Sequence, residues 1–300
     1  MKIPSNARAI ERYVALDIHK EYVMAGGMNA AQEWVLRPRR VEMERFRAWA
    51  ISNLRMGDAV VIEATTNVWD IYDIVVGLVS RVVVAHPAAV EQIAEARVKT
   101  DKQDIERLLR LLIAGIVPEV WVPPVHVREL RALISYRWRL VKMSIMIQNR
   151  LHSLLHRHNI HPPEGGLDTE KNRSWWEQQE FSPLETLQVK QELATLYQVE
   201  RHKREIEQEL GRMSNSEPWA SQAAYLMQLP GVGVVITMTA LAAIGDIGRF
   251  ESPKKAGGLC WLGCGRARQR QGASRQEDHQ VRTQGVALGD DRGGVAGGLA

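Results

Sequence analysis

Two apolar segments of the chain each carry one carboxylate, and this combination restricts what the chain can fold into. Asp17 lies within Tyr13–Ile18, and Glu63 lies near the end of Ala59–Ala64. Short runs rich in β-branched residues, bounded by polar or glycine-containing segments, are typical of strands covered on both faces of a sheet. An unpaired buried carboxylate is costly. A buried strand therefore tolerates one only near its end, facing a cation, a hydrogen-bond donor or water.

Two further acids lie at the start of a predicted helix. Between residues 99 and 112 the apolar side chains recur at helical spacing, and Asp101 and Asp104 fall in the first turn. Residues three apart share a helix face, so both carboxylates can point at one site. Oxygen ligands suit Mg²⁺ or Mn²⁺, and two such ions can hold the attacking and leaving oxygens of a phosphoryl displacement.

We therefore predict one metal-binding and catalytic set, which consists of Asp17, Glu63, Asp101 and Asp104. The alternative for any one of these acids alone is a helix cap or a partner of the helix dipole. All four together favour the metal site.

The order of elements before residue 124 predicts an α/β domain of the ribonuclease-H-like type over residues 10–124. Two strands follow the first one closely enough for an antiparallel meander, and helices and strands then alternate. The expected elements are strands at Tyr22–Gly26 and Glu33–Leu36, a helix over Val41–Leu54, the Glu63 strand, a helix over Asn67–Leu78, a strand at Arg81–Ala85 and a helical stretch over Ala88–Gly115. Prolines between residues 117 and 124 end the domain, since proline interrupts helices and ladders.

A long predicted helix beginning at Val125 is strongly basic. Residues 125–161 contain seven Lys and Arg against the single acid Glu129, together with an apolar stripe. Such a helix can lie along phosphates while it packs on a partner helix; a solvated helical face is the alternative. The predicted nucleic-acid contacts on it are Arg131, Arg137, Arg139, Lys142 and Arg150. A mixed-charge helix over Leu184–Met213 is the expected return arm of a helical hairpin or coiled coil over residues 125–215.

A glycine motif precedes an apolar helix further along the chain. Gly231 and Gly233 stand one residue apart directly before residues 234–244. Backbone N–H groups in such a turn can face a phosphate, so both glycines are predicted nucleic-acid contacts. A plain helix-entry turn is the alternative. We expect a small, mainly helical domain over residues 220–262.

Composition excludes several classes of protein. The chain has 300 residues and 45% hydrophobic content, which suffices for two domains with real cores. It shows no secretory signal and no run of membrane-spanning length, so we expect a cytoplasmic protein with no membrane partner. The two cysteines, Cys260 and Cys264, are too few for a disulfide framework.

Several segments together resemble the DEDD-type transposases of the insertion-sequence 110/116/902 family. The segments are Ala15–Lys20, Val61–Thr65, Lys99–Asp104, Leu229–Gly233 and Ile244–Ala256, within residues 13–263. The resemblance implies a Holliday-junction-resolvase-like N-terminal domain, a helical hairpin that oligomerises and a C-terminal transposase domain. Members of the family recombine DNA, some of them directed by a guide RNA, and their C-terminal domain supplies a serine nucleophile.

The chain departs from the family pattern after Leu262. Residues 263–300 contain nine glycines and no periodic apolar stripe, so we expect them to be disordered. Written with GC-rich codons and shifted by one nucleotide, residues 277–293 can encode a basic segment with a Ser-Gly pair, of the kind the family has there. We interpret the tail as frameshifted and do not assign Ser274 as the nucleophile.

The sequence thus predicts a DNA transposase or recombinase of an insertion sequence. It would use Mg²⁺, or Mn²⁺, for strand cleavage and transfer, act on DNA with or without a guide RNA, and form a homo-oligomer. One alternative is a structure-specific junction-resolving nuclease. The other is a catalytically defective relic that still binds nucleic acid.

Overall fold

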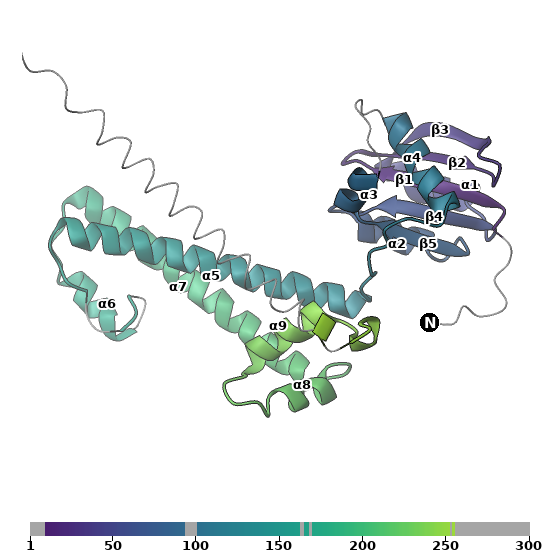
Figure 1. The fold of residues 1–300 in the computed structure, drawn as a ribbon. Coiled ribbons are helices and arrows are strands. Elements are labelled where there is room, and N and C mark those ends of the chain that lie inside the picture. The colour runs from purple at the N-terminus through teal and green to yellow at the C-terminus, as the bar shows by residue number, and fades with distance from the viewer. Residues whose placement is uncertain (1–9, 94–100, 163–164, 168–169, 253, 256–300) are drawn as a thin grey trace, which may run out of the picture. The chain divides into compact units, whose positions relative to one another are not determined.

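The computed structural model describes residues 10–93, 101–162, 165–167, 170–252 and 254–255 of the chain. Figure 1 shows their helices and strands. The chain divides into two compact units between Val122 and Pro123. The tail predicted to be frameshifted, residues 263–300, lies outside the described residues.

The first unit is built on a five-stranded mixed sheet. Its strands are β1 (Arg12–Ile18), β2 (Tyr22–Met28), β3 (Trp34–Glu42), β4 (Asp58–Glu63) and β5 (Arg81–Ala85). The spatial order is β3-β2-β1-β4-β5. β2 runs antiparallel to both β1 and β3, whereas β4 runs parallel to both β1 and β5. The carboxyl ends of β1 and β4 therefore lie side by side at the same end of the sheet.

Helices α1 (Met43–Asn53) and α2 (Val68–Val75) cover one face of this sheet (Figure 1). Phe46 of α1 and Ile71 of α2 belong to one buried cluster with Leu16 of β1. Burying one such side chain is worth about 1.5–3 kcal/mol. This apolar layer anchors the strands whose ends carry Asp17 and Glu63.

Helices α3 (Pro87–Ile93) and α4 (Asp101–Ile113) belong to the opposite face. Ile105 of α4 is fully buried in a cluster with Ala15. A Cβ built on Gly26 of β2 would lie 2.8 Å from Cγ2 of Ile105, so a side chain there would displace the helix. The glycine thus allows the close approach that fixes the first turn of α4.

Strand β3 is longer than the sequence pattern predicted. The pattern predicts a strand that ends at Leu36 and a helix that begins at Val41, but β3 continues to Glu42 and α1 begins at Met43. Antiparallel pairing with β2 holds the extra residues. Pro38 is accommodated because β3 is an edge strand, where a missing N–H need not break a ladder.

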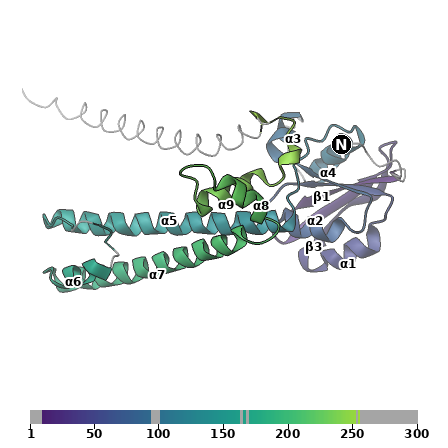
Figure 2. The same cartoon turned by 90° about the horizontal axis from the view of Figure 1, so that it is seen from below.

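A helical hairpin dominates the second unit. Its arms are α5 (Val125–Arg157) and α7 (Pro183–Ser214), which lie side by side in Figures 1 and 2. The sequence pattern predicted both arms, and α7 differs from the prediction by one residue at each end. The short helix α6 (Glu170–Glu177) lies near the hairpin tip. The helices α8 (Ala220–Leu226) and α9 (Val234–Ile244) pack near the opposite end, and the 3-10 turn η1 (Ile247–Arg249) follows α9.

Apolar packing and a helix cap stabilise the hairpin. Leu151 of α5 and Leu196 of α7 are both almost completely buried. At the start of α7 the Ser182 side chain accepts a hydrogen bond from the Glu185 backbone, and the Glu185 side chain accepts one from the Ser182 backbone. This capping box satisfies donors that a helix start otherwise leaves unpaired. Within the described part of the chain, every helix is too short or too polar to cross a membrane.

Candidate metal centre

Asp17 and Glu63 lie at neighbouring strand ends on one face of the sheet. The parallel register of β1 and β4 runs up to the residue before each acid. Ala15 and Val61, two positions earlier, both belong to the cluster beneath α4. Because side chains alternate along a strand, Asp17 and Glu63 emerge on that same face. The sheet thus directs both carboxylates toward the α4 side.

The first turn of α4 brings a third carboxylate close to Asp17. Asp101 and Asp104 both occupy this turn, as the sequence predicted. One oxygen of Asp17, one oxygen of Asp101 and one ring nitrogen of His19 all lie within 4.8 Å of one another. His19 Nε2 is 3.0 Å from Asp17 Oδ2 and 4.0 Å from Asp101 Oδ2. His19 was not among the predicted site residues.

The other two predicted acids lie outside this closest group. Among the described residues, neither Asp104 nor Glu63 belongs to the group of donor atoms within 4.8 Å. Asp104 Oδ1 is 3.0 Å from Arg107 Nη2 on the same helix. Its charge still reaches Asp17, because the Asp104 carboxylate helps to raise the pKa of Asp17.

Burial is the main cause of a raised pKa at Asp17. The side chain is only 15% exposed, and desolvation disfavours its charged form. His19 opposes this shift, while the carboxylates of Asp104 and Asp101 add to it. The surroundings of Asp17 therefore disfavour its ionised form.

The donor set fits a divalent cation. Two carboxylate oxygens and one imidazole nitrogen converge on one place, and carboxylates are the ligands that Mg²⁺ and Mn²⁺ favour. Asp101 is 42% exposed, so the place is accessible from solvent. Perturbed carboxylates in such clusters are common at functional sites.

One predicted phosphate contact makes hydrogen bonds inside the second unit. The Arg131 guanidinium donates to the backbone carbonyls of Ala242 and Ala243, at 2.7 and 3.2 Å. These carbonyls lie in the last turn of α9. A cation there satisfies unpaired carbonyls and complements the helix dipole. Arg131 therefore ties α5 to α9.

Two more of the predicted contacts join the arms of the hairpin through glutamates of α7. These ion pairs are Arg137 Nε to Glu207 Oε1 at 2.9 Å and Arg150 Nε to Glu192 Oε1 at 2.7 Å. Arg139 and Lys142, by contrast, have exposed side chains. The sequence showed an excess of positive charge on α5 but could not show which of these charges α7 neutralises.

The glycine motif forms a tight turn before α9. Gly231 has a φ of +80°, in the left-handed region that favours glycine. Gly233 is the N-cap of α9, and no side chain caps that helix start. Both glycines are exposed. A phosphate contact at this turn stays a prediction.

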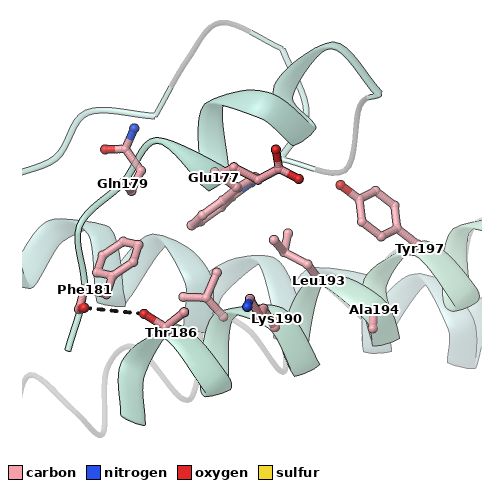
Figure 3. Close-up of a pocket in the computed structure, with 10 residues that line it drawn as sticks. Glu177, Gln179, Phe181, Thr186, Lys190, Leu193, Ala194 and Tyr197 are labelled. Atoms are coloured by element: carbon pink, nitrogen blue, oxygen red, sulfur yellow. Dashed lines mark hydrogen bonds between the residues drawn. The ribbon is translucent and has the colours of Figure 1, made fainter. Parts of the chain in front are cut away.

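A separate pocket of about 470 Å³ lies between α6 and α7 (Figure 3). Its walls include Trp176, Phe181 and Leu193, and Lys190 also lines it. Glu177 is the single carboxylate among its lining residues. This pocket therefore lacks the converging acids that a divalent metal centre needs.

A mixed sheet with Asp17 and Glu63 at its strand ends, covered by a helix that brings Asp101 close to Asp17, defines an α/β domain with an acidic cluster. Residues 14–160 match the family model described as a DEDD transposase of the IS110 type, and residues 223–287 match the transposase IS116/IS110/IS902 family. The two matches together span more than half of the chain. The chain belongs to this transposase family, which confirms the resemblance found in the sequence.

A curated relative agrees with this assignment. The protein named "Putative transposase y4qE" of Sinorhizobium fredii (strain NBRC 101917 / NGR234) is 25% identical over 230 residues. The alignment covers 74% of this chain and 55% of the relative, so the chain spans about half the length of that protein. The second family match ends at residue 287. It therefore extends beyond Leu262, the residue after which the sequence was expected to depart from the family pattern.

Proposed function

We propose that the chain is a DNA transposase of an insertion sequence that cleaves and transfers DNA strands with Mg²⁺ or Mn²⁺. The observation that carries the proposal is the convergence of donor atoms from Asp17, Asp101 and His19, among which Asp17 has a pKa raised by partial burial. Membership of the transposase family supports DNA as the substrate. The strand order β3-β2-β1-β4-β5 supports a ribonuclease-H-like first domain.

Each acid has a distinct part in this proposal. Asp17 and Asp101 would supply oxygen ligands from two different elements, and Glu63 of β4 and Asp104 of α4 would supply further ligands. Bound divalent cations supply charge stabilisation to the attacking and leaving oxygens of a phosphoryl displacement. The surrounding sheet and helix hold the carboxylates in place before DNA arrives, so little reorganisation is needed at the moment of reaction.

The second unit would contact the DNA backbone and a second copy of the chain. The exposed Arg139 and Lys142 suit phosphates, whether of DNA or of a guide RNA, because backbone contacts carry little sequence information. Trp138 and Ile145, seven residues apart and therefore on one side of α5, are 53% and 52% exposed. Large apolar side chains gathered on a surface favour self-association, which supports a homo-oligomer.

Removal of the acids tests the proposal directly. The double variant Asp17→Asn, Asp104→Ala should bind Mn²⁺ at least about tenfold more weakly than the unaltered chain and lose metal-dependent DNA cleavage. Titration calorimetry with Mn²⁺ measures the first effect, and gel analysis of labelled DNA measures the second. Joined strands among the products indicate transposition, whereas hydrolysed junctions alone indicate a resolving nuclease.

A matched variant controls for the general loss of negative charge. Asp70→Asn removes an exposed acid from α2, a helix on the opposite face of the sheet, and should leave Mn²⁺ affinity unchanged. Equal Mn²⁺ affinity in the double variant and the unaltered chain would rule out the proposed ligands.

A further inference from the structure

Three planar side chains from three adjacent segments stack beside the carboxylates. The Arg40 guanidinium carbon of β3 lies 4.0 Å from the centroid of the Tyr22 ring. The His19 ring lies 4.3 Å from the same centroid, with an interplanar angle of 18°. The guanidinium and the imidazole therefore both lie against the tyrosine ring. We refer to these residues as the Arg40–Tyr22–His19 stack.

The polar edges of the stack touch two different carboxylates. The Tyr22 hydroxyl donates a hydrogen bond of 3.1 Å to Asp101 Oδ2. His19 Nε2 lies 3.0 Å from Asp17 Oδ2. Asp17 belongs to β1 and Asp101 to α4, so neighbouring members of one rigid stack contact acids from separate elements.

The stack is itself held in place by the edge of the sheet. Register pairs Arg40 with Met24, so Arg40 lies diagonally across from Tyr22 on the same face, a position from which long side chains can interact. Arg40 Nε also donates to Glu42 Oε1 at 2.9 Å. A cation over a tyrosine face is attracted by the ring. Two strands and the turn between β1 and β2 thus limit how far the Tyr22 hydroxyl can move.

We propose that the Arg40–Tyr22–His19 stack positions Asp17 and Asp101 relative to each other for cation binding, with Tyr22 as the principal positioning residue. This inference rests on the proposed metal-dependent function. Asp101 needs such a partner because its side chain is 42% exposed and stands in the first turn of a helix. Hydrogen-bond partners behind metal ligands orient them and commonly change metal affinity by about 10–100-fold when removed.

The change Tyr22→Phe tests this role. Phenylalanine keeps the ring against Arg40 and His19 but removes the donor to Asp101. We expect the Mn²⁺ dissociation constant, measured by titration calorimetry, to rise about tenfold, with the thermal midpoint of the metal-free protein nearly unchanged. DNA cleavage should require more Mn²⁺ for half-maximal rate, while its rate at saturating Mn²⁺ should change much less.

Two sets of variants separate positioning from a general structural effect. Tyr72→Phe alters a tyrosine of α2 that packs on the opposite face of the sheet, and it should leave Mn²⁺ affinity unchanged. Arg40→Gln should weaken Mn²⁺ binding in the same direction as Tyr22→Phe but by less. Arg40→Lys should recover part of that loss because it keeps the cation.

The outcomes distinguish this inference from the proposed function. One outcome is that Asp17→Asn, Asp104→Ala loses Mn²⁺ binding while Tyr22→Phe keeps the affinity of the unaltered chain. That outcome would overturn the positioning role and would still support the metal centre. An unaltered chain that binds no Mn²⁺ would overturn the metal centre, and the positioning role with it.

Discussion

Two aspartates of the first unit, the buried Asp58 and the partly buried Asp17, have opposite electrostatic surroundings. Asp58 is 2% exposed and pairs with the Arg12 guanidinium at 2.6 Å, and it also accepts a hydrogen bond of 2.8 Å from the Arg55 backbone. Asp17 instead lies near Asp101 and Asp104, and burial raises its pKa. Asp58, whose charge is paired with a cation, contributes to the stability of the fold. Asp17, whose ionised form is disfavoured by its surroundings, lowers that stability.

The sign of the pH effect at Asp17 follows from linkage. A raised folded-state pKa means that the folded chain binds this proton more tightly than the unfolded chain does. Stability from this group is therefore greatest in acid and falls as pH rises from the ordinary aspartate pKa of 3.8 through the raised folded-state pKa. At neutral pH the ionised Asp17 lowers the free energy of unfolding.

The change Asp17→Asn should accordingly stabilise the metal-free protein at neutral pH, and its advantage should shrink in mild acid. Each kcal/mol gained would raise the melting temperature of the first unit by about 4–8 °C, as for domains of similar size. Excess Mn²⁺ should stabilise the unaltered chain and not this variant, because only a site with its ligands gains binding energy on folding. Thermal melts at two pH values, with and without Mn²⁺, measure all three effects.

The change Asp58→Asn serves as a control, because it should lower the melting temperature that Asp17→Asn raises. It leaves the buried Arg12 without its charged partner, and breaking a buried ion pair commonly costs about 3–5 kcal/mol. A lower melting temperature in Asp17→Asn than in the unaltered chain, at neutral pH without metal, would contradict the inference that the surroundings of Asp17 disfavour its ionised form.

At the scale of single elements, the helix α5 carries basic residues of two kinds. Arg137 is 18% exposed at its side chain and pairs with Glu207 across the hairpin. Arg139, two positions along, is exposed and lies 5.4 Å from the Tyr136 ring centroid. One charge holds the arms together, and the other faces solvent, where a phosphate can reach it.

The variants Arg139→Gln and Arg137→Gln should therefore differ in their effects. For duplex DNA, the slope of log affinity against log salt concentration should flatten by about one in Arg139→Gln, since each lost phosphate contact removes one released counterion. Arg137→Gln should lower the melting temperature of the hairpin more than Arg139→Gln does, and should leave the slope nearly unchanged. Salt titrations of DNA binding measure the slopes, and equal flattening by both variants would contradict this division.

The elements themselves could largely be predicted from the sequence. Apolar runs predicted β1, β4 and β5, and apolar residues at helical spacing predicted α5 and α7. Both signals arise because the buried face of an element requires apolar residues at regular positions. The second half of β3 has no such apolar pattern in the sequence. Only Val41 is buried among residues Pro38 to Glu42, so pairing with β2 rather than a periodic buried face makes them a strand.

The candidate site could be predicted only in part. Carboxylates inside apolar runs are costly, so Asp17 and Glu63 stood out as residues. His19 and Tyr22 carried no such signal, because polar residues next to a strand end are common. Their place beside Asp101 depends on the packing of α4 against the sheet, which brings together residues 79 positions apart in the chain.

At the scale of the whole molecule, each compact unit has its own buried apolar residues. The first unit contains two clusters on the two faces of its sheet. In the second unit, Leu151 and Leu196 are buried between the arms of the hairpin. Units with separate cores commonly unfold in separate transitions, so one melting temperature does not describe such a chain.

Two core variants should therefore act on different transitions in a calorimetric scan. Val61→Ala removes two methyl groups from a fully buried residue of the sheet, and Leu196→Ala truncates a fully buried residue of the hairpin. Leu196→Ala should cost about 2–5 kcal/mol and lower only the transition of the second unit. Val61→Ala should lower only the transition that Mn²⁺ raises, because the residues of the proposed metal centre belong to the first unit. A single transition that both variants lower equally would show that the two units unfold as one.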